Sequence, residues 1–165
     1  MLKKLLFLLL MVIFGTQALA VSLNGAGATF PAPIYSKWFD LFAQETGINV
    51  NYQAIGSGGG VRQFTNGVVD FGASDAFMSE KEIDAAGGDV LHIPTVMGSV
   101  AIVYNLPVSG IKLDPRALAG IYLGKITNWN DPDISELNPG KSLPNKKITV
   151  VHRSDGSGTT SIFTN

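Results

Sequence analysis

The chain has 165 residues, of which 45% are hydrophobic and 15% are charged; its net charge is −1 and it contains no cysteine. A chain without a basic excess is not typical of proteins that bind nucleic acid or a membrane surface, so we expect neither partner. A chain without cysteine forms no disulfides, and its stability must come from an ordinary packed core.

The N-terminal twenty residues resemble a secretory signal peptide. Lys3 and Lys4 precede an apolar run over 5–14, and the small residues Ala18-Leu19-Ala20 follow. The run is shorter than the roughly 20 residues that a membrane-spanning helix needs. Cleavage after Ala20 and export of the remaining chain are therefore predicted, with a short uncleaved core helix as the alternative.

Strands and helices alternate in the first part of the mature chain. Pro31 and Pro33 suit the first turn of a helix, and Gly47 has the place of a left-handed C-cap. Between them an apolar face, which we expect to pack on the core, is formed at helical spacing by Ile34, Trp38, Leu41 and Phe42. Apolar and polar residues alternate over 48–55, as in a strand. The pattern predicts strands over 23–26, 48–55 and 68–73, a helix over 31–47, and a shorter helix that follows Gly58–Gly60 and ends at Asn66-Gly67.

The remaining elements follow the same logic. Ser79 and Glu82 have the spacing of a capping box, Asp114-Pro115 is typical of a helix start, and Gly124 of a helix end. The predicted helices are 80–86, 115–123 and 159–165; the predicted strands are 90–96, 100–105 and 148–151; and a surface connection with one short helix is predicted over 126–147. This alternation favours an α/β fold with a largely parallel sheet.

Three glycine-rich segments each lead from a predicted strand into a predicted helix. They are 25–30, 55–60 and 153–160. Glycines allow a ligand to approach the backbone, and the unpaired N–H groups of a first helical turn attract anions. One such segment is more often a simple turn, but three together predict an oxyanion site at the carboxyl ends of the strands.

Three charged residues refine this hypothesis. Arg153 and Asp155 are placed so that the carboxylate could brace the guanidinium, whose planar fork fits two oxygens of an oxyanion, although a surface cation and a helix cap are the simpler interpretations. Asp75 would repel an anion unless the anion carries a proton that it can donate. Hydrogen phosphate does so and sulfate at neutral pH does not, so Asp75 favours phosphate.

These motifs resemble the periplasmic phosphate-binding proteins of high-affinity phosphate ABC transporters. The resemblance is carried in order by the segments 25–33, 70–75, 121–126 with Trp129, and 153–159. It implies a two-lobed periplasmic-binding-protein-like clamp, no cofactor or metal, and phosphate in the cleft between the lobes. By position, the resemblance implies phosphate-binding roles for Thr29, Phe30, Ser57, Asp75, Arg153, Asp155, Ser157, Gly158 and Thr159.

The resemblance also implies a lobe organisation and partners. Residues 21–96 would start the first lobe and 97–165 the second. In that family the chain continues well beyond the position of Asn165 and returns to complete the first lobe, so we expect this sequence to lack a C-terminal part. Inorganic phosphate and the membrane permease of a phosphate ABC transporter are the implied partners, and the periplasm is the implied compartment.

Other functions remain as alternatives. A binding protein for sulfate, molybdate or tungstate is disfavoured by Asp75 and Asp155, and a phosphate-binding surface protein that feeds no transporter is not excluded. A secreted hydrolase would use Ser157 as nucleophile, but Asp155 stands where G-x-S-x-G requires glycine. A metal site is not expected, because His92 and His152 are the only histidines.

Overall fold

The computed structural model describes residues 21–165, which group into two compact units. Residues 21–97 together with Asp155–Asn165 form one unit, and Gly98–Ser154 form the other. The first boundary between the units, at 97/98, lies next to the predicted lobe boundary at 96/97. The C-terminal stretch, however, groups with the first unit, whereas the sequence assigned it to the second lobe.

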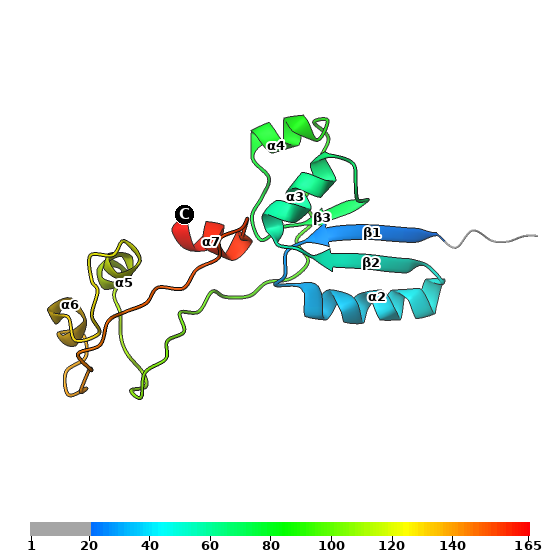
Figure 1. Ribbon diagram of the computed structural model, residues 1–165. Coiled ribbons are helices and arrows are strands. Elements are labelled where there is room, and N and C mark those ends of the chain that lie inside the picture. The colour runs from blue at the N-terminus through cyan, green and yellow to red at the C-terminus, as the bar shows by residue number, and fades with distance from the viewer. Residues whose placement is uncertain (1–20) are drawn as a thin grey trace, which may run out of the picture. The chain divides into compact units, whose positions relative to one another are not determined.

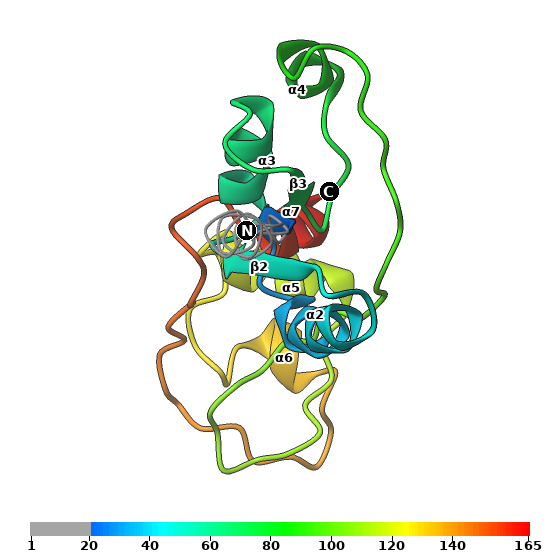
Figure 2. The ribbon, with the colours of Figure 1, turned by 90° about the vertical axis from the view of Figure 1, so that its right-hand side faces the viewer.

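The first unit is built on a three-stranded parallel sheet, as the alternation predicted. Its strands are β1 (Ser22–Gly27), β2 (Asn49–Ala54) and β3 (Phe71–Ala73), in the order β2-β1-β3. Helix α2 (Ala32–Thr46) connects β1 to β2, and α3 (Ser57–Thr65) connects β2 to β3. Because these connections run to opposite sides of β1, right-handed crossovers place the two helices on opposite faces of the sheet, as Figures 1 and 2 show.

Helix α2 has the predicted bounds but a different buried face. Gly47 is its left-handed C-cap, with φ 73°. Tyr35 is buried, and Phe39, one turn later, contacts the rings of Tyr52 and Phe71 on the sheet. Four large apolar side chains expected to face the core are instead each exposed by more than a third: Ile34, Trp38, Leu41 and Phe42. The core assignment of Trp38 was therefore wrong, because the aromatic pair at i and i+4 occupies the sheet-facing side.

Gly25 makes room for the rings on that face of the sheet. It is paired with Tyr52 on one side and with Phe71 on the other. The two rings stack across β1, with centroids 6.1 Å apart and planes 13° apart. A Cβ at position 25 would collide with the Phe71 ring. This glycine therefore serves aromatic packing and not the approach of a ligand, which corrects the interpretation made from the sequence.

On the other face, α3 lies against the strands through Gly60. A Cβ at this position would lie 2.6 Å from the carbonyl oxygen of Ala26 and 2.9 Å from that of Ala73. Both atoms belong to strand backbone and cannot rotate away. Glycine thus lets the helix backbone approach the sheet closely, which fixes the start of α3 above the ends of β1 and β3.

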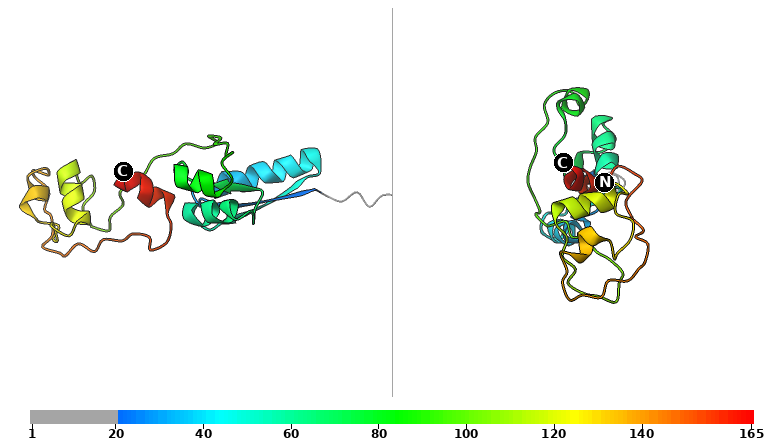
Figure 3. Two further views of the ribbon diagram at one scale, coloured as in Figure 1. Left: turned by 90° about the horizontal axis from the view of Figure 1, so that it is seen from above. Right: turned by 90° about the vertical axis from the view of Figure 1, so that its left-hand side faces the viewer.

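Three predicted strands are absent from the described residues, and a fourth is shorter than predicted. Residues 90–96, 100–105 and 148–151 form no ladder, and β3 is confined to Phe71–Ala73. Figure 3 shows that the chain from α4 to α5 is drawn without helix or strand. Leu91, Ile93 and Val103 in this stretch are largely exposed. An apolar β-branched segment becomes a strand only where a neighbour pairs with its backbone.

Capping residues stand at the start of the short helices α4 and α7, and the capping box of α4 is the one that the sequence predicted. In α4 (Glu80–Ala85) the side chain of Ser79 accepts a hydrogen bond from the Glu82 amide, and the Glu82 carboxylate accepts one from the Ser79 amide at 2.8 Å. Helix α7 (Gly158–Thr164) begins after Ser157, whose hydroxyl accepts a hydrogen bond from the Thr160 amide at 3.2 Å.

The second unit is organised around a small apolar core. Asp114 caps α5 (Pro115–Tyr122) by accepting a hydrogen bond from the Ala117 amide at 2.6 Å, and α6 (Pro132–Ser135) is the short helix predicted within 126–147. The buried residues of this core are Ala117, Ile121, Ile126 and Ile134. Within residues 21–165, no helix is long and apolar enough to cross a membrane. The predicted signal peptide lies outside the described residues.

Candidate functional site

The candidate site lies at the carboxyl-end edge of the parallel sheet, where the strand order reverses. Here the carbonyl oxygen of Gly27 accepts hydrogen bonds from the amides of Ile55 at 3.0 Å and Gly56 at 2.9 Å. The amide of Ala28 donates to the carbonyl oxygen of Ala73 at 2.8 Å. These bonds tie the segments that follow β1, β2 and β3 to one another, so residues distant in sequence share one edge. Ligands of open α/β sheets bind at such a reversal.

Ser57 and Asp75 meet at this edge. Ser57 is the first residue of α3 and is only 5% exposed. Its Oγ accepts a hydrogen bond from the Asp75 amide at 3.2 Å, and its hydroxyl proton can still be donated to a ligand. The structure therefore brings together two of the predicted site residues from different loops.

The start of α7 belongs to the same cluster. Gly158 is buried, and a Cβ on it would lie 2.5 Å from Oδ2 of Asp75 and would also collide with the Ser57 hydroxyl. In addition, the Gly58 amide donates to the carbonyl oxygen of Gly156 at 3.1 Å. The close approach requires glycine at position 158, and it places the 156–159 segment against the Ser57 and Asp75 loops.

Several backbone donors at this edge donate to no backbone acceptor among residues 21–165. They come from the first turns of helices or from the residues just before them, where N–H groups have no partner inside the helix. These donors are the amides of Thr29, Phe30, Ser57, Gly158 and Thr159. Among the hydroxyls, Ser157 Oγ already accepts from Thr160, so it can offer a ligand its proton.

A tyrosine whose role was not predicted from the sequence, Tyr52, forms a hydrogen bond to the segment that follows β1 at this edge. Tyr52 on β2 donates from its hydroxyl to the carbonyl oxygen of Ala28 at 2.7 Å. Burial, followed by the neighbouring Tyr35 and the Asp75 carboxylate, raises the pKa of the Tyr52 phenol far above its usual value. The strand alternation over 48–55 could assign Tyr52 to one face, but it could not reveal which carbonyl the hydroxyl reaches.

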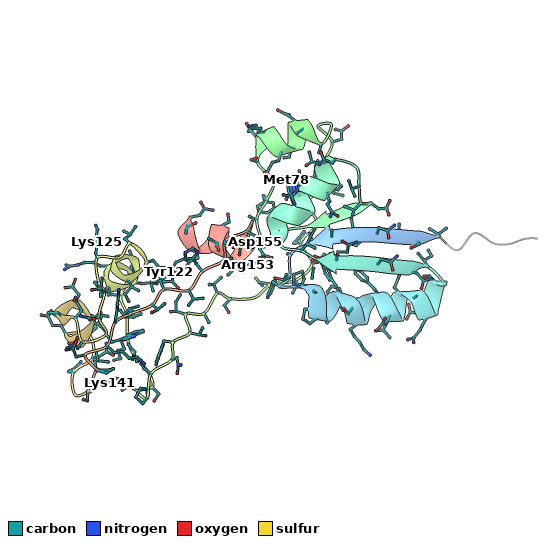
Figure 4. The ribbon with its side chains drawn as sticks, in the orientation of Figure 1. Met78, Tyr122, Lys125, Lys141, Arg153 and Asp155 are labelled. Atoms are coloured by element: carbon teal, nitrogen blue, oxygen red, sulfur yellow. The ribbon has the colours of Figure 1, made fainter. Side chains whose placement is uncertain are left out.

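Arg153 and Asp155 fall on either side of the division between the units. Arg153 belongs to Gly98–Ser154 and is exposed, and Asp155 opens the stretch that groups with the sheet. Both side chains are labelled in Figure 4, on the segment that precedes α7. Their predicted pairing with each other and with phosphate stays a prediction.

Both histidines have partners other than Ser157, the nucleophile of the hydrolase alternative. His92 Nε2 accepts a hydrogen bond from the Met78 amide at 3.2 Å, and its ring contacts Phe77 edge-on. His152 Nδ1 lies 2.9 Å from the carbonyl oxygen of Arg153. Residues 21–165 contain no group of three or more histidine, aspartate or glutamate side chains that could hold a metal ion.

The sequence is similar to those of known proteins. A family model described as a PBP superfamily domain matches residues 15–165. The phosphate-binding protein PstS of Haemophilus influenzae is 52% identical over 151 residues, which cover 90% of this chain and 45% of the relative. PstS of Pasteurella multocida is 49% identical over 164 residues, which cover 96% and 47%.

A solved structure shares the fold. It is a putative phosphate ABC transporter substrate-binding protein with bound phosphate from Clostridium perfringens, with a TM-score of 0.62 and 27% sequence identity. The match covers 86% of this chain and 54% of that one. The chain thus spans about half the length of the relatives it matches.

Proposed function

Because this chain belongs to the PBP superfamily, we propose that the natural protein binds inorganic phosphate outside the cytoplasm and delivers it to the permease of an ABC transporter. The observation that carries the proposal is the meeting of three loops at one sheet edge. There, Ser57 at the start of α3 bonds to the Asp75 loop, and Gly158 at the start of α7 lies directly against both, beside the segment that leads from β1 into α2.

This set of groups fits hydrogen phosphate. Amides and hydroxyls donate to the ligand's unprotonated oxygens, and the helix starts add the positive ends of their dipoles. Asp75 accepts the proton that hydrogen phosphate carries, whereas a fully ionised sulfate would place two anions in contact. The relatives named as phosphate-binding proteins and the phosphate-bound solved structure are consistent with this choice.

Arg153 has a role in the same proposal. Its guanidinium pairs with two phosphate oxygens, and Asp155 holds the guanidinium in place. Replacing Arg153 with alanine should weaken phosphate binding by about 2–5 kcal/mol if the pair is buried around the ligand. Calorimetry measures this directly, and an unchanged affinity would place Arg153 outside the site.

Two compact units suit a clamp. In the proposed cycle, phosphate bridges two lobes and shifts an open–closed equilibrium towards the closed form, which docks on the permease. The predicted signal peptide over 1–20 would direct the protein to the periplasm.

The test uses the full-length natural protein and an Asp75→Asn variant. Calorimetry should show tight phosphate binding by the parent, and a roughly 10- to 100-fold fall in the preference for phosphate over sulfate in the variant, because a charged acceptor is lost. Asp70→Asn is the matched control: the Asp70 carboxylate accepts a hydrogen bond from the Asn24 amide at 2.8 Å, but Asp70 lies at the other end of β3 from Asp75. An unchanged ratio in Asp75→Asn would remove Asp75 from this role, and tight sulfate binding by the parent would favour the other-oxyanion alternative.

A hydrolase is the second candidate. It would need a base beside Ser157, and the two histidines are bonded to Met78 and Arg153 instead. Incubation of the full-length protein with phosphate monoesters tests this directly. Release of phosphate that disappears in Ser157→Ala would favour catalysis over binding alone.

A further inference from the structure

Tyr52 touches the candidate site through a single carbonyl group. Its hydroxyl donates to the carbonyl oxygen of Ala28 at 2.7 Å. Its ring is held between Phe71, stacked across β1, and Tyr35, which meets it edge-on with centroids 5.3 Å apart. The direction of the hydroxyl is therefore set by packing, and the phenol is not free to turn elsewhere.

The bonded carbonyl shares a peptide plane with an amide of the site. The C=O of Ala28 and the N–H of Thr29 belong to the same planar trans peptide, and among residues 21–165 no peptide bond is cis. In a trans peptide these two groups point in opposite directions. A hydroxyl that fixes the carbonyl of Ala28 on one side therefore aims the N–H of Thr29 to the other side.

The rest of the loop is already pinned on its strand side. The Ala28 amide donates to Ala73, and the Gly27 carbonyl accepts from Ile55 and Gly56. Without the Tyr52 bond, the Ala28–Thr29 peptide is the first plane after β1 with no backbone hydrogen bond to hold it, since the Thr29 amide donates to no backbone acceptor among residues 21–165. Rotation of this plane would turn a phosphate donor away.

The phenol is also suited to remain a donor. Burial and the nearby Tyr35 and Asp75 raise its pKa well above the usual value, so its proton is present at all physiological pH values. A hydrogen bond accepted by a carbonyl polarises the peptide and strengthens the bond that its N–H donates. Orientation and polarisation thus act on the same amide.

We infer that Tyr52 is a positioning residue for phosphate binding: its hydroxyl holds the Ala28–Thr29 peptide so that the Thr29 amide points at the oxyanion. This inference rests on the proposed phosphate-binding function. Tyr52 does not touch the ligand itself.

The test compares two phenol-to-phenyl changes in the full-length protein. Tyr52→Phe removes the hydroxyl and keeps the ring, and it should weaken phosphate binding about three- to tenfold, the effect of one neutral hydrogen bond. Tyr35→Phe is the matched control, because its hydroxyl contacts Thr95 Oγ1 at 2.7 Å in the same aromatic cluster but no loop of the site. It should leave phosphate affinity unchanged.

A second measurement separates positioning from general stability. In the phosphate-saturated parent, the Thr29 amide proton should resonate far downfield by NMR, and Tyr52→Phe should move it back upfield while the Tyr35→Phe spectrum keeps it. In the unmodified protein, added phosphate should move the Tyr52 hydroxyl proton downfield through the shared peptide, so that the inference can be tested even if Tyr52→Phe does not fold.

The outcomes are distinct. A parent that binds no phosphate overturns the proposed function. A parent that binds phosphate, with equal affinity in Tyr52→Phe and an unmoved Thr29 resonance, overturns the role of Tyr52 and leaves the function standing. Equal weakening in both phenyl variants, or a Tyr52 hydroxyl proton that does not respond to phosphate, likewise overturns the positioning role.

Discussion

Replacing Gly60 with alanine should destabilise the sheet unit although it improves helix propensity. The new Cβ would lie 2.6 Å from the Ala26 carbonyl oxygen and 2.9 Å from that of Ala73, whereas ordinary van der Waals contact begins at 3.4 Å. These neighbours are strand backbone, so α3 must move away from the sheet. Overpacking of this kind costs about 1–3 kcal/mol.

Helix propensity acts in the opposite direction and is smaller. Alanine is favoured over glycine in a helix interior by roughly 1 kcal/mol. Because two strands oppose the new methyl group, we place the overpacking cost at the upper end of its range, and expect a net loss of about 1–2 kcal/mol. Displacement of α3 would also carry Ser57 away from Asp75 and weaken phosphate binding.

Gly59→Ala is the matched control in the same helix. A Cβ at position 59 meets only the side chain of Ile55, at 3.0 Å, and that side chain can adjust. Urea unfolding of the full-length protein, followed by circular dichroism, should lower the midpoint for Gly60→Ala by about 1 M, at a slope of about 1–2 kcal/mol per M. The midpoint for Gly59→Ala should stay or rise. Equal midpoints for the two variants would refute the close approach of α3 to β1.

The remaining predictions concern the caps and the second core. Hydrogen bonds from Ser79 lower the pKa of Glu82 below its ordinary 4.5. The ionised Glu82 side chain therefore stabilises α4 above about pH 4.5, and this stabilisation is lost as the pH falls through the lowered pKa. In Ser79→Ala, NMR titration should find the Glu82 pKa raised back towards 4.5. Asp114→Ala should cost about 1 kcal/mol in urea unfolding, because the Ala117 amide loses its acceptor. Ile134→Ala should cost about 2–5 kcal/mol, since Ile134 is fully buried, and a loss under 1 kcal/mol would show that the core of the second unit collapses around the gap.

The sequence was sufficient to predict the features that depend only on residues close to one another in the chain. The Gly47 C-cap, the Ser79–Glu82 box and the Asp114 cap act within a few residues, and each lies where its pattern predicted. The alternation of strands and helices predicted the parallel sheet, and the motifs predicted the family. Such features need no knowledge of distant parts of the chain.

The sequence was not sufficient where a residue's role depends on what packs against it. The sequence predicted that the stripe containing Trp38 faces the core, and only the rings on the sheet decided in favour of Tyr35 and Phe39. The strands predicted over 90–96, 100–105 and 148–151 form no ladder in the described chain, where Lys147 makes only an isolated bridge with Asn128; a ladder requires two segments, and a pattern describes one.

The site shows the same division. From residue types and spacing alone, the sequence determined that glycines, hydroxyls and Asp75 follow strands and precede helices, and hence that an oxyanion site belongs at their ends. Only the tertiary structure decided that Gly25 and Gly60 serve packing, that Gly158 admits Asp75 beside Ser57, and that Tyr52 reaches Ala28. The physical reason is that contacts between residues far apart in sequence are fixed by the register of β1 with its neighbours and by the closeness of helix to sheet, neither of which is encoded in any one segment.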